Sequence, residues 1–338
     1  MRIVPRMRLG VSVLAAAAAS ALLAGCVTAP PVAGVSPSAA ASATPGPSPT
    51  TSSAPAPTAC SPRATASYSP STTSDYADKI RARGYLLVGV SADTRLLGAV
   101  NPQKPQDFVG FDIAMAQLVA RSIFGTVTEK NLQFKVISTA NRIPELTKEV
   151  DATDNAKGGV DLVARAFTMN CARWQLQQVA FSAEYYKAHQ GVMIPSRSAE
   201  TVKTLDDLSG KKVCAPNGST SLVTIKQKNP KVETVGVVNH TDCLVQLQQG
   251  KVDAITGDDA ILAGFKAQDP TTQVIDGLEL SDEPYGLGVP WAHKDFAAYI
   301  NNVLEQARKD GSWQKAYDGS LKSALGPGTQ PAPLYGRS

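Results

Sequence analysis

The sequence lacks the residue patterns that mark metal centres and common catalytic sites. Its three histidines, His189, His240 and His293, are far apart in the chain, and its five cysteines show no metal-ligand spacing. It contains no G-x-S-x-G motif, and no nucleophile stands in a recognisable arrangement with a base. We therefore expect no metal, no cofactor and no enzymatic activity.

A strong net charge is also absent once the first segment is set aside. The chain has 33 basic and 29 acidic residues, a formal charge of +4. Residues 1–25 contain three arginines and no acid, so the rest of the chain has 30 basic and 29 acidic residues. It shows no stripe of lysines or arginines, and the basic pI gives no support for nucleic-acid binding.

The apolar run at the N-terminus is too short to span a membrane. It follows a basic start (Arg2, Arg6 and Arg8), extends over residues 10–22, and ends in Leu-Ala-Gly-Cys at 23–26, which is typical of a signal peptide. This ending resembles the bacterial lipoprotein signal, in which the cysteine becomes the lipidated first residue. We expect removal of residues 1–25, lipidation of Cys26 (palmitate) and anchoring at the outer face of the cytoplasmic membrane. A simple cleaved signal with an incidental cysteine is the alternative.

From Val27 to about Pro70 the chain has few large apolar residues and consists almost entirely of Ala, Pro, Ser, Thr and Gly. Such a composition cannot bury enough apolar surface to offset chain entropy. Its prolines keep the segment moderately stiff. Residues 26–70 are therefore expected to be the lipidated cysteine and a disordered tether, although a glycosylated stalk is compatible with the same residues.

Four cysteines remain beside Cys26, an even number that suggests two disulfides in an exported protein, with three possible pairings. Cys214 and Cys243 lie in the same later region, on a predicted strand and at a predicted helix start, and we pair them. Cys60 with Cys171 then follows by elimination only.

The remaining part, about 260 residues, alternates predicted strands and helices, which indicates parallel α/β sheets. Two cycles of about a hundred residues each suggest two lobes. Predicted helices of the first cycle are 75–83, 111–124 and 142–149, and its strands are 85–90, 132–137 and 160–164. The second cycle has strands at 212–215, 233–238 and 252–256 and helices at 219–228, 241–249 and 259–267, followed by a strand-like run at 285–289 and helices at 295–309 and 312–323.

Polar side chains follow the predicted strands, where ligands bind in open parallel sheets. Arginines and hydroxyls collect in the first lobe, and small donors with acids collect in the second, although strand-end loops are polar in any case. Together they match the groups that a small zwitterion requires. The first lobe supplies Ser91, Asp93, Arg95, Arg142, Arg165, Thr168 and Arg173, and the second supplies residues 216–220 and 257–259.

The stretch Asp161–Tyr186 combines a buried strand, a polar turn and a helix start. Backbone N–H groups at a helix start lack intrahelical partners and attract anions. Asn170 is the predicted N-cap, which puts Arg173 in the first turn, where a cation opposes the helix dipole. A bound carboxylate would explain this arginine, because the guanidinium fork matches two oxygens. An ordinary surface arginine is the alternative.

Read in order, many short motifs resemble the family 3 extracellular solute-binding proteins, the amino-acid receptors of bacterial ABC importers, and most of all their glutamine/glutamate branch. The resemblance covers about residues 75–325. The matching segments are 87–90, 110–113, 159–162, Thr168 with Arg173, 181–182 with 185–186, 207–213, 218–220, 250–254 with Asp258, and 310–313.

This resemblance implies an α/β, two-lobed periplasmic-binding-protein (type II) fold, in which each lobe is a mostly parallel sheet flanked by helices. Residues 71–188 and 286–325 would form lobe 1, residues 189–285 lobe 2, and residues 326–338 a flexible tail. Two hinge strands, one after Tyr185-Tyr186 and one at 285–289, would join the lobes, which close over the ligand. We expect a monomer that delivers a polar amino acid to an ABC importer permease.

The resemblance also assigns the ligand contacts. Arg173 would hold the α-carboxylate, and Asp258 would receive the α-ammonium. The remaining donors would be Thr168 and the backbone near Ala166, Gly218, Ser219 and Thr220.

Three departures bear on the ligand side chain. Pro216 stands where a polar donor is usual, Ser91, Asp93 and Arg95 replace the usual aromatic residues, and Arg142 matches an arginine of glutamate-type members. The extra cations favour glutamate or aspartate over glutamine or asparagine. Asp93 could instead neutralise Arg95, which would favour a neutral ligand. The loop 151–159 is longer than usual, with no functional explanation.

Two other functions fit the same residues. The chain could be a sensor subunit that signals through a membrane partner. It could also be an enzyme, since the same fold occurs in a cyclohexadienyl dehydratase.

Overall fold

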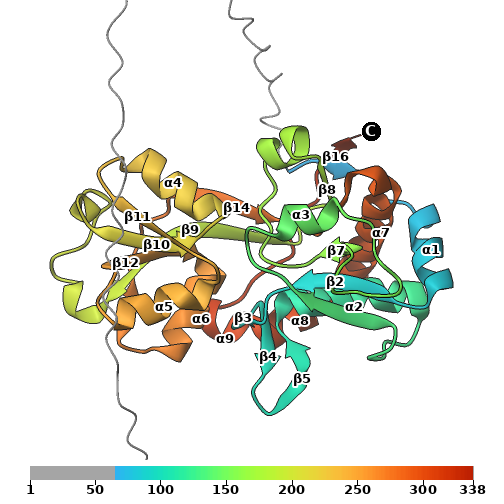
Figure 1. Ribbon diagram of the computed structural model, residues 1–338, viewed down its shortest axis with the longest axis horizontal. Coiled ribbons are helices and arrows are strands. Elements are labelled where there is room, and N and C mark those ends of the chain that lie inside the picture. Colours follow the sequence, from blue (N-terminus) through green and yellow to red (C-terminus); the bar gives the residue numbers. More distant parts are fainter. Residues whose placement is uncertain (1–64, 338) are drawn as a thin grey trace, which may run out of the picture. The chain divides into compact units, whose positions relative to one another are not determined.

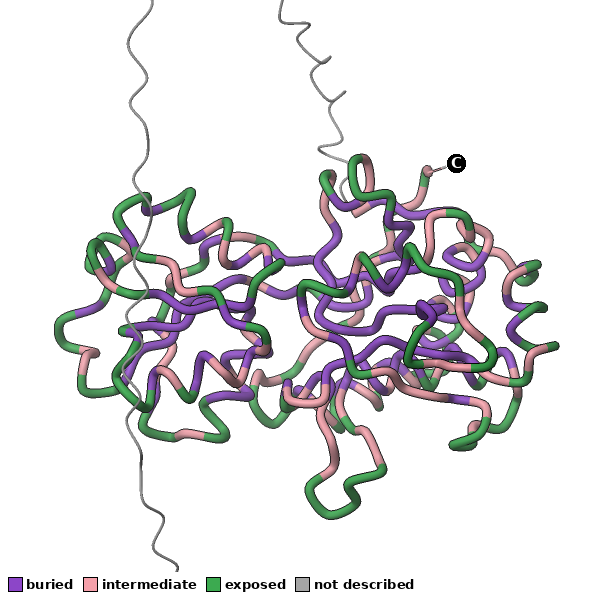
Figure 2. Tube along the Cα trace, viewed as in Figure 1, coloured by how far each residue is buried: buried purple, intermediate pink, exposed green. Residues whose placement is uncertain are grey.

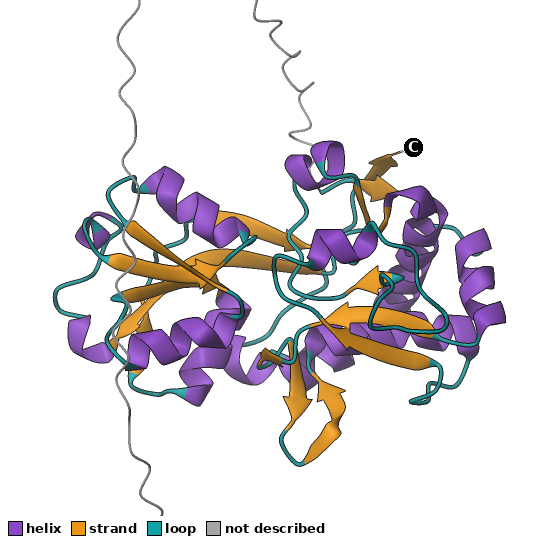
Figure 3. Ribbon diagram, viewed as in Figure 1, coloured by secondary structure: helices purple, strands orange, loops and turns teal. Residues whose placement is uncertain are grey.

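The computed structural model describes residues 65–337, and the labels used below are those of Figure 1. These residues form two lobes, each a sheet flanked by helices (Figure 3). The predicted two-lobed α/β fold is therefore confirmed. No helix within residues 65–337 is long and apolar enough to cross a membrane.

The sheet of lobe 1 has the order β6-β2-β7-β15-β8. Strand β2 pairs in parallel with β6 and β7, whereas β15 runs antiparallel to β7 and β8, so the sheet is mixed. Its strands are β2 (Leu86–Val90), β6 (Leu132–Val136), β7 (Leu162–Val163), β8 (Val179–Phe181) and β15 (Gly288–Pro290).

Alternating side chains of β2 explain why lobe 1 has helices on both faces. Leu86, Val88 and Val90 belong to one core with helix α2, while Leu87 belongs to a second core with Phe167. The helices are α1 (Asp75–Arg83), α2 (Phe111–Phe124), α3 (Arg142–Leu146), α7 (Lys294–Asp310), α8 (Ser312–Ser320) and α9 (Lys322–Leu325).

Several predicted helices of lobe 1 are confirmed, since α1 and α2 have the predicted bounds. The side chain of Ser74 accepts a hydrogen bond from the Ala77 backbone, and Gly84 ends α1 in a left-handed conformation at φ 92°. Helix α3 ends at Leu146, three residues earlier than predicted. The predicted helix after Asn170 is a π-helical turn, Ala172–Leu176.

Lobe 2 contains the sheet β11-β10-β12-β9-β13, with β14 also paired to β9. Strands β10, β11 and β12 are parallel, and β9 runs antiparallel to its partners. The strands are β9 (Tyr186–Pro195), β10 (Lys212–Pro216), β11 (Glu233–Val237), β12 (Ala254–Asp258), β13 (Thr272–Val274) and β14 (Ser281–Tyr285), and the helices are α4 (Thr220–Lys228), α5 (His240–Gln248) and α6 (Asp259–Gln268). Short 3-10 turns of lobe 2 lie at Ser196–Ser198 and Asp206–Leu208, and another, Trp291–His293, lies between β15 and α7 of lobe 1.

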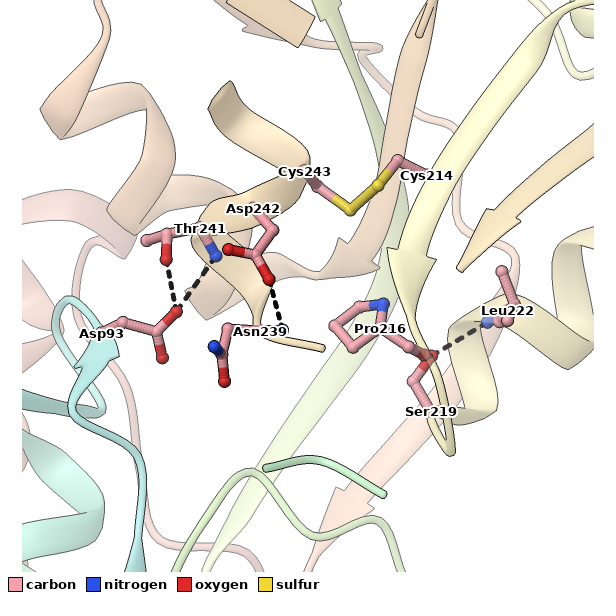
Figure 4. The surroundings of a disulfide bond; sticks show 9 residues. All are labelled: Asp93, Cys214, Pro216, Ser219, Leu222, Asn239, Thr241, Asp242 and Cys243. Atoms are coloured by element: carbon pink, nitrogen blue, oxygen red, sulfur yellow. Dashed lines mark hydrogen bonds between the residues drawn. A yellow bond between two sulfur atoms is a disulfide. The ribbon is translucent and has the colours of Figure 1, made fainter. Parts of the chain in front are cut away.

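Neighbouring side chains of β10 again face opposite layers. Val213 packs with Ile225 of α4, whereas Cys214 packs in the core that contains Leu244 of α5. A disulfide joins Cys214 to Cys243, as predicted, with an S–S distance of 2.00 Å (Figure 4). It ties β10 to the first turns of α5.

Cys171 is also disulfide-bonded. Its predicted partner, Cys60, lies outside the described residues, as do the predicted signal peptide and Cys26.

Two extended segments connect the lobes. Strand β9 begins at Tyr186, which pairs with Tyr285 at the end of β14. A further bridge joins Thr168 to Tyr285. The second connection starts with β14 and leads into β15 of lobe 1, so the segment predicted as one strand at 285–289 consists of the ends of two.

A small antiparallel sheet was not predicted. It consists of β3 (Asp93–Thr94), β4 (Gly98–Asn101) and β5 (Lys104–Val109). Figure 2 shows that its far end is exposed, in contrast to the buried strands at the centre of each lobe. The polar residues of β5 carry no apolar alternation from which a strand could be predicted.

The prediction of a flexible tail at 326–338 is wrong for residues 335–337, which form a strand on lobe 1. Strand β16 (Tyr335–Arg337) pairs in parallel with β1 (Ser67–Tyr68), so the ordered domain also starts before residue 71. The Tyr335 hydroxyl donates to Glu305 at 2.7 Å, and Arg308 donates to the Gln330 carbonyl at 3.0 Å. These polar contacts with α7 supply the order that the Pro- and Gly-rich composition did not suggest.

Candidate functional site

Arg142 connects the two lobes through backbone carbonyls. It is buried at the start of α3, and its Nε donates to the Thr139 carbonyl at 3.0 Å. Its Nη1 donates to the Ala166 carbonyl at 2.6 Å, and its Nη2 reaches across to the Gly218 carbonyl of lobe 2 at 3.1 Å. Burial, together with the positive charges of neighbouring arginines, holds the pKa of Arg142 well below its ordinary value.

Arg173 approaches the same carbonyl from the π-helical turn. Its Nη1 donates to the Thr168 carbonyl at 2.5 Å and its Nη2 to the Gly218 carbonyl at 3.4 Å. The side chain of Asn170 accepts from the Arg173 backbone N–H at 2.9 Å, so Asn170 caps this turn as the sequence suggested. Burial lowers the pKa of Arg173 to about 10, and the charges of Glu283 and Asp258 oppose that decrease. Arg173 is therefore a cation at neutral pH.

Both guanidinium groups stack on one aromatic ring. The Arg142 Cζ lies 4.7 Å and the Arg173 Cζ 4.8 Å from the ring centroid of Phe167, which is fully buried. Cation–π attraction offsets part of the repulsion between these two like charges. Phe167 thus fixes the positions of both arginines.

A cavity of about 600 Å³ opens beside these arginines. It lies between α3, the π-helical turn and the start of α4, where Ser219 accepts a hydrogen bond from the Leu222 backbone (Figure 4). The predicted site residues that line it are Arg142, Arg173, Gly218, Ser219 and Thr220. Residues of both lobes that were predicted from the sequence therefore line the same cavity.

Lobe 2 contributes two buried acids near this point. Asp258, at the end of β12, accepts from the Tyr285 hydroxyl at 2.5 Å and from the Ser221 hydroxyl at 3.4 Å. Glu283 on β14 accepts from the hydroxyls of Thr220 at 2.6 Å and Ser281 at 2.7 Å. Thr168 of lobe 1 lies 3.4 Å from the Thr220 hydroxyl.

The Asp258 carboxyl is electrostatically strained by this setting. Burial raises the pKa of Asp258 to about 8, and the nearby charge of Glu283 acts in the same direction. A cation placed beside it would lower this pKa and stabilise the carboxylate. Two acids and two arginines at one lobe boundary therefore present both signs of charge to a small molecule.

Ser91, Asp93 and Arg95 were predicted to contact the ligand. In this structure they contact other parts of the protein. The Asp93 carboxylate accepts from the Thr241 backbone N–H at 3.1 Å and hydroxyl at 2.5 Å, as Figure 4 shows, and from the Ser91 hydroxyl at 2.7 Å. Arg95 is exposed and donates to the Ala267 carbonyl at 3.2 Å. No ion pair joins Asp93 to Arg95 among the described residues. Both residues link lobe 1 to lobe 2.

Ala166 is present at the site, but its backbone N–H is already used. It donates to Asp112 at 2.9 Å, and the residue has φ +41°, a conformation that non-glycine residues rarely adopt. The other Asp112 oxygen accepts from the Tyr185 hydroxyl at 2.6 Å. In this structure, therefore, Ala166 contributes its carbonyl, which Arg142 binds, rather than a free donor.

Sequence reasoning missed Glu283 and placed no emphasis on Arg165. Glu283 lies on a hinge strand between Asp282 and Pro284, where no motif distinguishes it. Arg165 follows the apolar run 160–164, and that position was the available signal. Its Nη1 donates to the Thr139 hydroxyl at 2.6 Å, and the side chain is 1% exposed.

No group of three or more His, Cys, Asp or Glu side chains within residues 65–337 is arranged to hold a metal ion. The candidate site is thus built from arginines, carboxylates, hydroxyls and backbone groups.

Comparison with known proteins finds related sequences and similar structures. The family model of bacterial extracellular solute-binding proteins, family 3, matches residues 86–322. The chain is 32% identical over 244 residues to the ABC transporter glutamine-binding protein GlnH of Bacillus subtilis, which covers 72% of this chain and 83% of that protein. It is 29% identical to the glutamate-binding protein GluB of Corynebacterium glutamicum, over 69% of this chain and 77% of that protein. A crystal structure of a mutant of ArgBP from T. maritima is 29% identical, with a TM-score of 0.62, and covers 73% of this chain and 99% of that one.

Proposed function

Because the chain belongs to the family 3 bacterial extracellular solute-binding proteins, we propose that it binds a polar amino acid between its lobes and delivers it to an ABC importer. The observation that carries this proposal is the meeting of two buried arginines with two buried acids at the lobe boundary. An amino acid carries one carboxylate and one ammonium, so it complements this set. The chain would bind its ligand without chemical turnover.

In this proposal Arg173 receives the α-carboxylate. Its Nη2 donates to the Gly218 carbonyl at 3.4 Å, a long hydrogen bond that a carboxylate oxygen would replace with a charge-assisted one. Thr168 and the backbone at Ser219 and Thr220 would supply further donors. Charge-assisted bonds contribute about 1.5–3 kcal/mol each, and two of them supply much of the roughly 8 kcal/mol of micromolar binding.

The α-ammonium is assigned to Asp258, with Glu283 beside it. The position is supported by the raised pKa of Asp258, which an adjacent cation would lower. Tyr285 would orient the carboxylate through its hydroxyl.

The ligand proposed is glutamate, aspartate or one of their amides. This rests on the named relatives, a glutamine-binding and a glutamate-binding protein, and on the surplus of arginines in lobe 1. The predicted lipoprotein signal at 23–26 supports export and attachment to the outer face of the cytoplasmic membrane through Cys26. A monomer is proposed as well.

Calorimetry of the soluble domain against the common amino acids tests the proposal. Arg173→Ala should lose binding almost completely, while Arg197→Ala, at an exposed arginine of lobe 2, should bind as the wild type does. If Arg173→Ala kept the wild-type affinity while folded, the assignment of the pocket would be wrong.

A further inference from the structure

Arg165 lies where three parallel strands of lobe 1 end. Strand β7 pairs with β2 in the register Val88 to Leu162 and Gly89 to Val163, so Arg165 comes level with Ser91 beyond both strands. Its Nη1 donates at 2.6 Å to Thr139, which follows β6 and lines the cavity between the lobes. The guanidinium is therefore at the ligand edge of the sheet, directly behind the cavity wall.

The guanidinium of Arg165 has donors without acceptors. Its Nε and Nη2 are buried, and no atom of residues 65–337 accepts a hydrogen bond from them. Buried unpaired donors of a charged group are costly, so their presence requires a reason. Arg142 and Arg173 differ in this respect, because both bind backbone carbonyls.

Nearby acids balance the charge of Arg165 without using these donors. Asp93 and Asp112 raise the pKa of Arg165 against the larger effect of burial, which lowers it to about 10. The Asp112 oxygens accept from Ala166 and Tyr185, and those of Asp93 accept from Thr241 and Ser91. Charge balance is thus supplied within the protein, and hydrogen-bond capacity is left over.

A second unpartnered group lies on the lobe 2 side. His240 is the first residue of α5, next to Thr241, whose bonds to Asp93 hold this helix end against lobe 1. The imidazole is 6% exposed, and its Nδ1 is buried with no hydrogen-bond partner in the described chain. Burial and the charge of Arg165 lower the pKa of His240 to about 3, so the ring is neutral and carries one N–H.

The unpaired donors of Arg165 determine which kind of ligand group can bind there. A carboxylate offers acceptors on both oxygens and fits the fork of Nε and Nη2. A side-chain amide offers one oxygen and turns its NH2 group toward further donors, which leaves part of the site unpaired.

From this geometry we infer that Arg165, assisted by His240, binds the side-chain carboxylate of the ligand and makes the chain selective for dicarboxylic amino acids. The inference rests on the proposed amino-acid receptor function and deepens it. Arg165 would then select an acidic side chain in place of Arg95 and Arg142, because those two arginines already donate to backbone carbonyls and Arg165 does not.

The test measures the ratio of affinities for glutamate and glutamine, and for aspartate and asparagine, by calorimetry. The wild type should prefer the acids. Arg165→Met should weaken acid binding roughly a hundredfold and amide binding less than about fivefold, as expected for loss of charge-assisted hydrogen bonds to one ligand group. Arg197→Met is the matched control and should leave the ratio unchanged.

Arg165→Lys keeps the charge but not the fork, so it should fall between the wild type and Arg165→Met. His240→Gln should reduce the preference for acids by roughly fivefold, in the range of one hydrogen bond. If Arg165→Met does not fold, these two variants decide the question, and an unchanged ratio in both overturns the inference.

The inference and the proposed function fail in different ways. A wild type that binds amides as tightly as acids, or a folded Arg165→Met that weakens both equally, overturns the role of Arg165 while the receptor function stands. A wild type that binds no amino acid overturns both.

Discussion

The two lobes present opposite charges to the space between them. Lobe 1 contributes Arg142, Arg165 and Arg173 from segments that follow its strands. Lobe 2 contributes Asp258 and Glu283, each fixed by hydroxyl groups. In lobe 1, backbone carbonyls and an aromatic ring hold Arg142 and Arg173, whereas side-chain donors hold the two acids of lobe 2.

This difference couples binding to closure. Either lobe alone offers one sign of charge, so a zwitterion gains its full set of contacts when both lobes reach it. Residues that join the lobes without contacting the ligand then affect only the stability of the closed conformation. Substitutions in the ligand site and in the other contacts between the lobes should therefore have different effects.

The largest effect is expected from removing Asp258, one of the two acids of lobe 2. Asp258→Ala should weaken amino-acid binding by roughly a hundredfold or more, because the ligand ammonium would be buried without a counter-charge, at about 3 kcal/mol. Calorimetry measures this, with the exposed Asp206→Ala of the same lobe as control. Equal affinities of the two variants would remove Asp258 from the site.

A smaller effect is expected where lobe 2 comes closest to lobe 1. Gly218 has φ +76°, and a Cβ there would lie 2.8 Å from the Ala140 Cα. Gly218→Ala should hinder closure and weaken binding by roughly tenfold or more. X-ray scattering with saturating ligand should show a more open average conformation, whereas Gly210→Ala, also at positive φ but with free space around it, tests backbone strain alone.

Asp258 should also make ligand affinity depend on pH. With its pKa near 8, Asp258 holds a proton at neutral pH in the ligand-free protein, and the ammonium partner requires its release. Affinity should therefore rise by up to roughly tenfold per pH unit from about pH 6 to 8. Calorimetry in buffers of different ionisation enthalpy measures the released proton.

The same group acts on stability with the opposite sign. Its folded pKa is raised above the unfolded value, so its contribution is present at low pH and is lost as the pH rises toward about 8. Asp258→Asn should abolish proton release and flatten this decline in the thermal unfolding of the ligand-free protein. A pH profile of binding that is unchanged in Asp258→Asn would contradict the assignment.

The smallest effect is expected from contacts that join the lobes away from the ligand. Thr241→Val removes the hydroxyl that donates to Asp93 at 2.5 Å but keeps the backbone bond. Ligand dissociation should accelerate roughly threefold to tenfold, and the glutamate-to-glutamine ratio should not change. Stopped-flow dissociation measures this, with the exposed Thr201→Val as control.

The alternation of strands and helices could be predicted because its signals are local. Ser74, Gly84, Gly110 and Gly125 bound α1 and α2, and the apolar positions of β2 and β10 have the expected spacing. The small sheet of β3, β4 and β5 and the order of residues 334–337 could not be predicted, because they depend on contacts with distant segments rather than on their own pattern.

The sequence predicted which residues belong to the site better than it predicted what each residue does there. Asp258 ends a strand, Arg173 and residues 218–220 follow strands, and strand ends meet at one edge of a sheet. The roles of Arg142 and Arg165 depend on which acceptors surround each guanidinium, and that depends on strand register and on the approach of lobe 2. Sequence spacing carries no information about either.

The pairing of β1 with β16 has a consequence for anyone who wishes to turn this domain into an optical reporter. Ser67 pairs with Tyr335, so both ends of the described chain lie side by side on lobe 1 and keep their separation when the lobes move. Fluorescent proteins fused to the two ends would report little. One fluorophore must sit on lobe 2, and the exposed turn at Ser196–Ser198 offers a place for it.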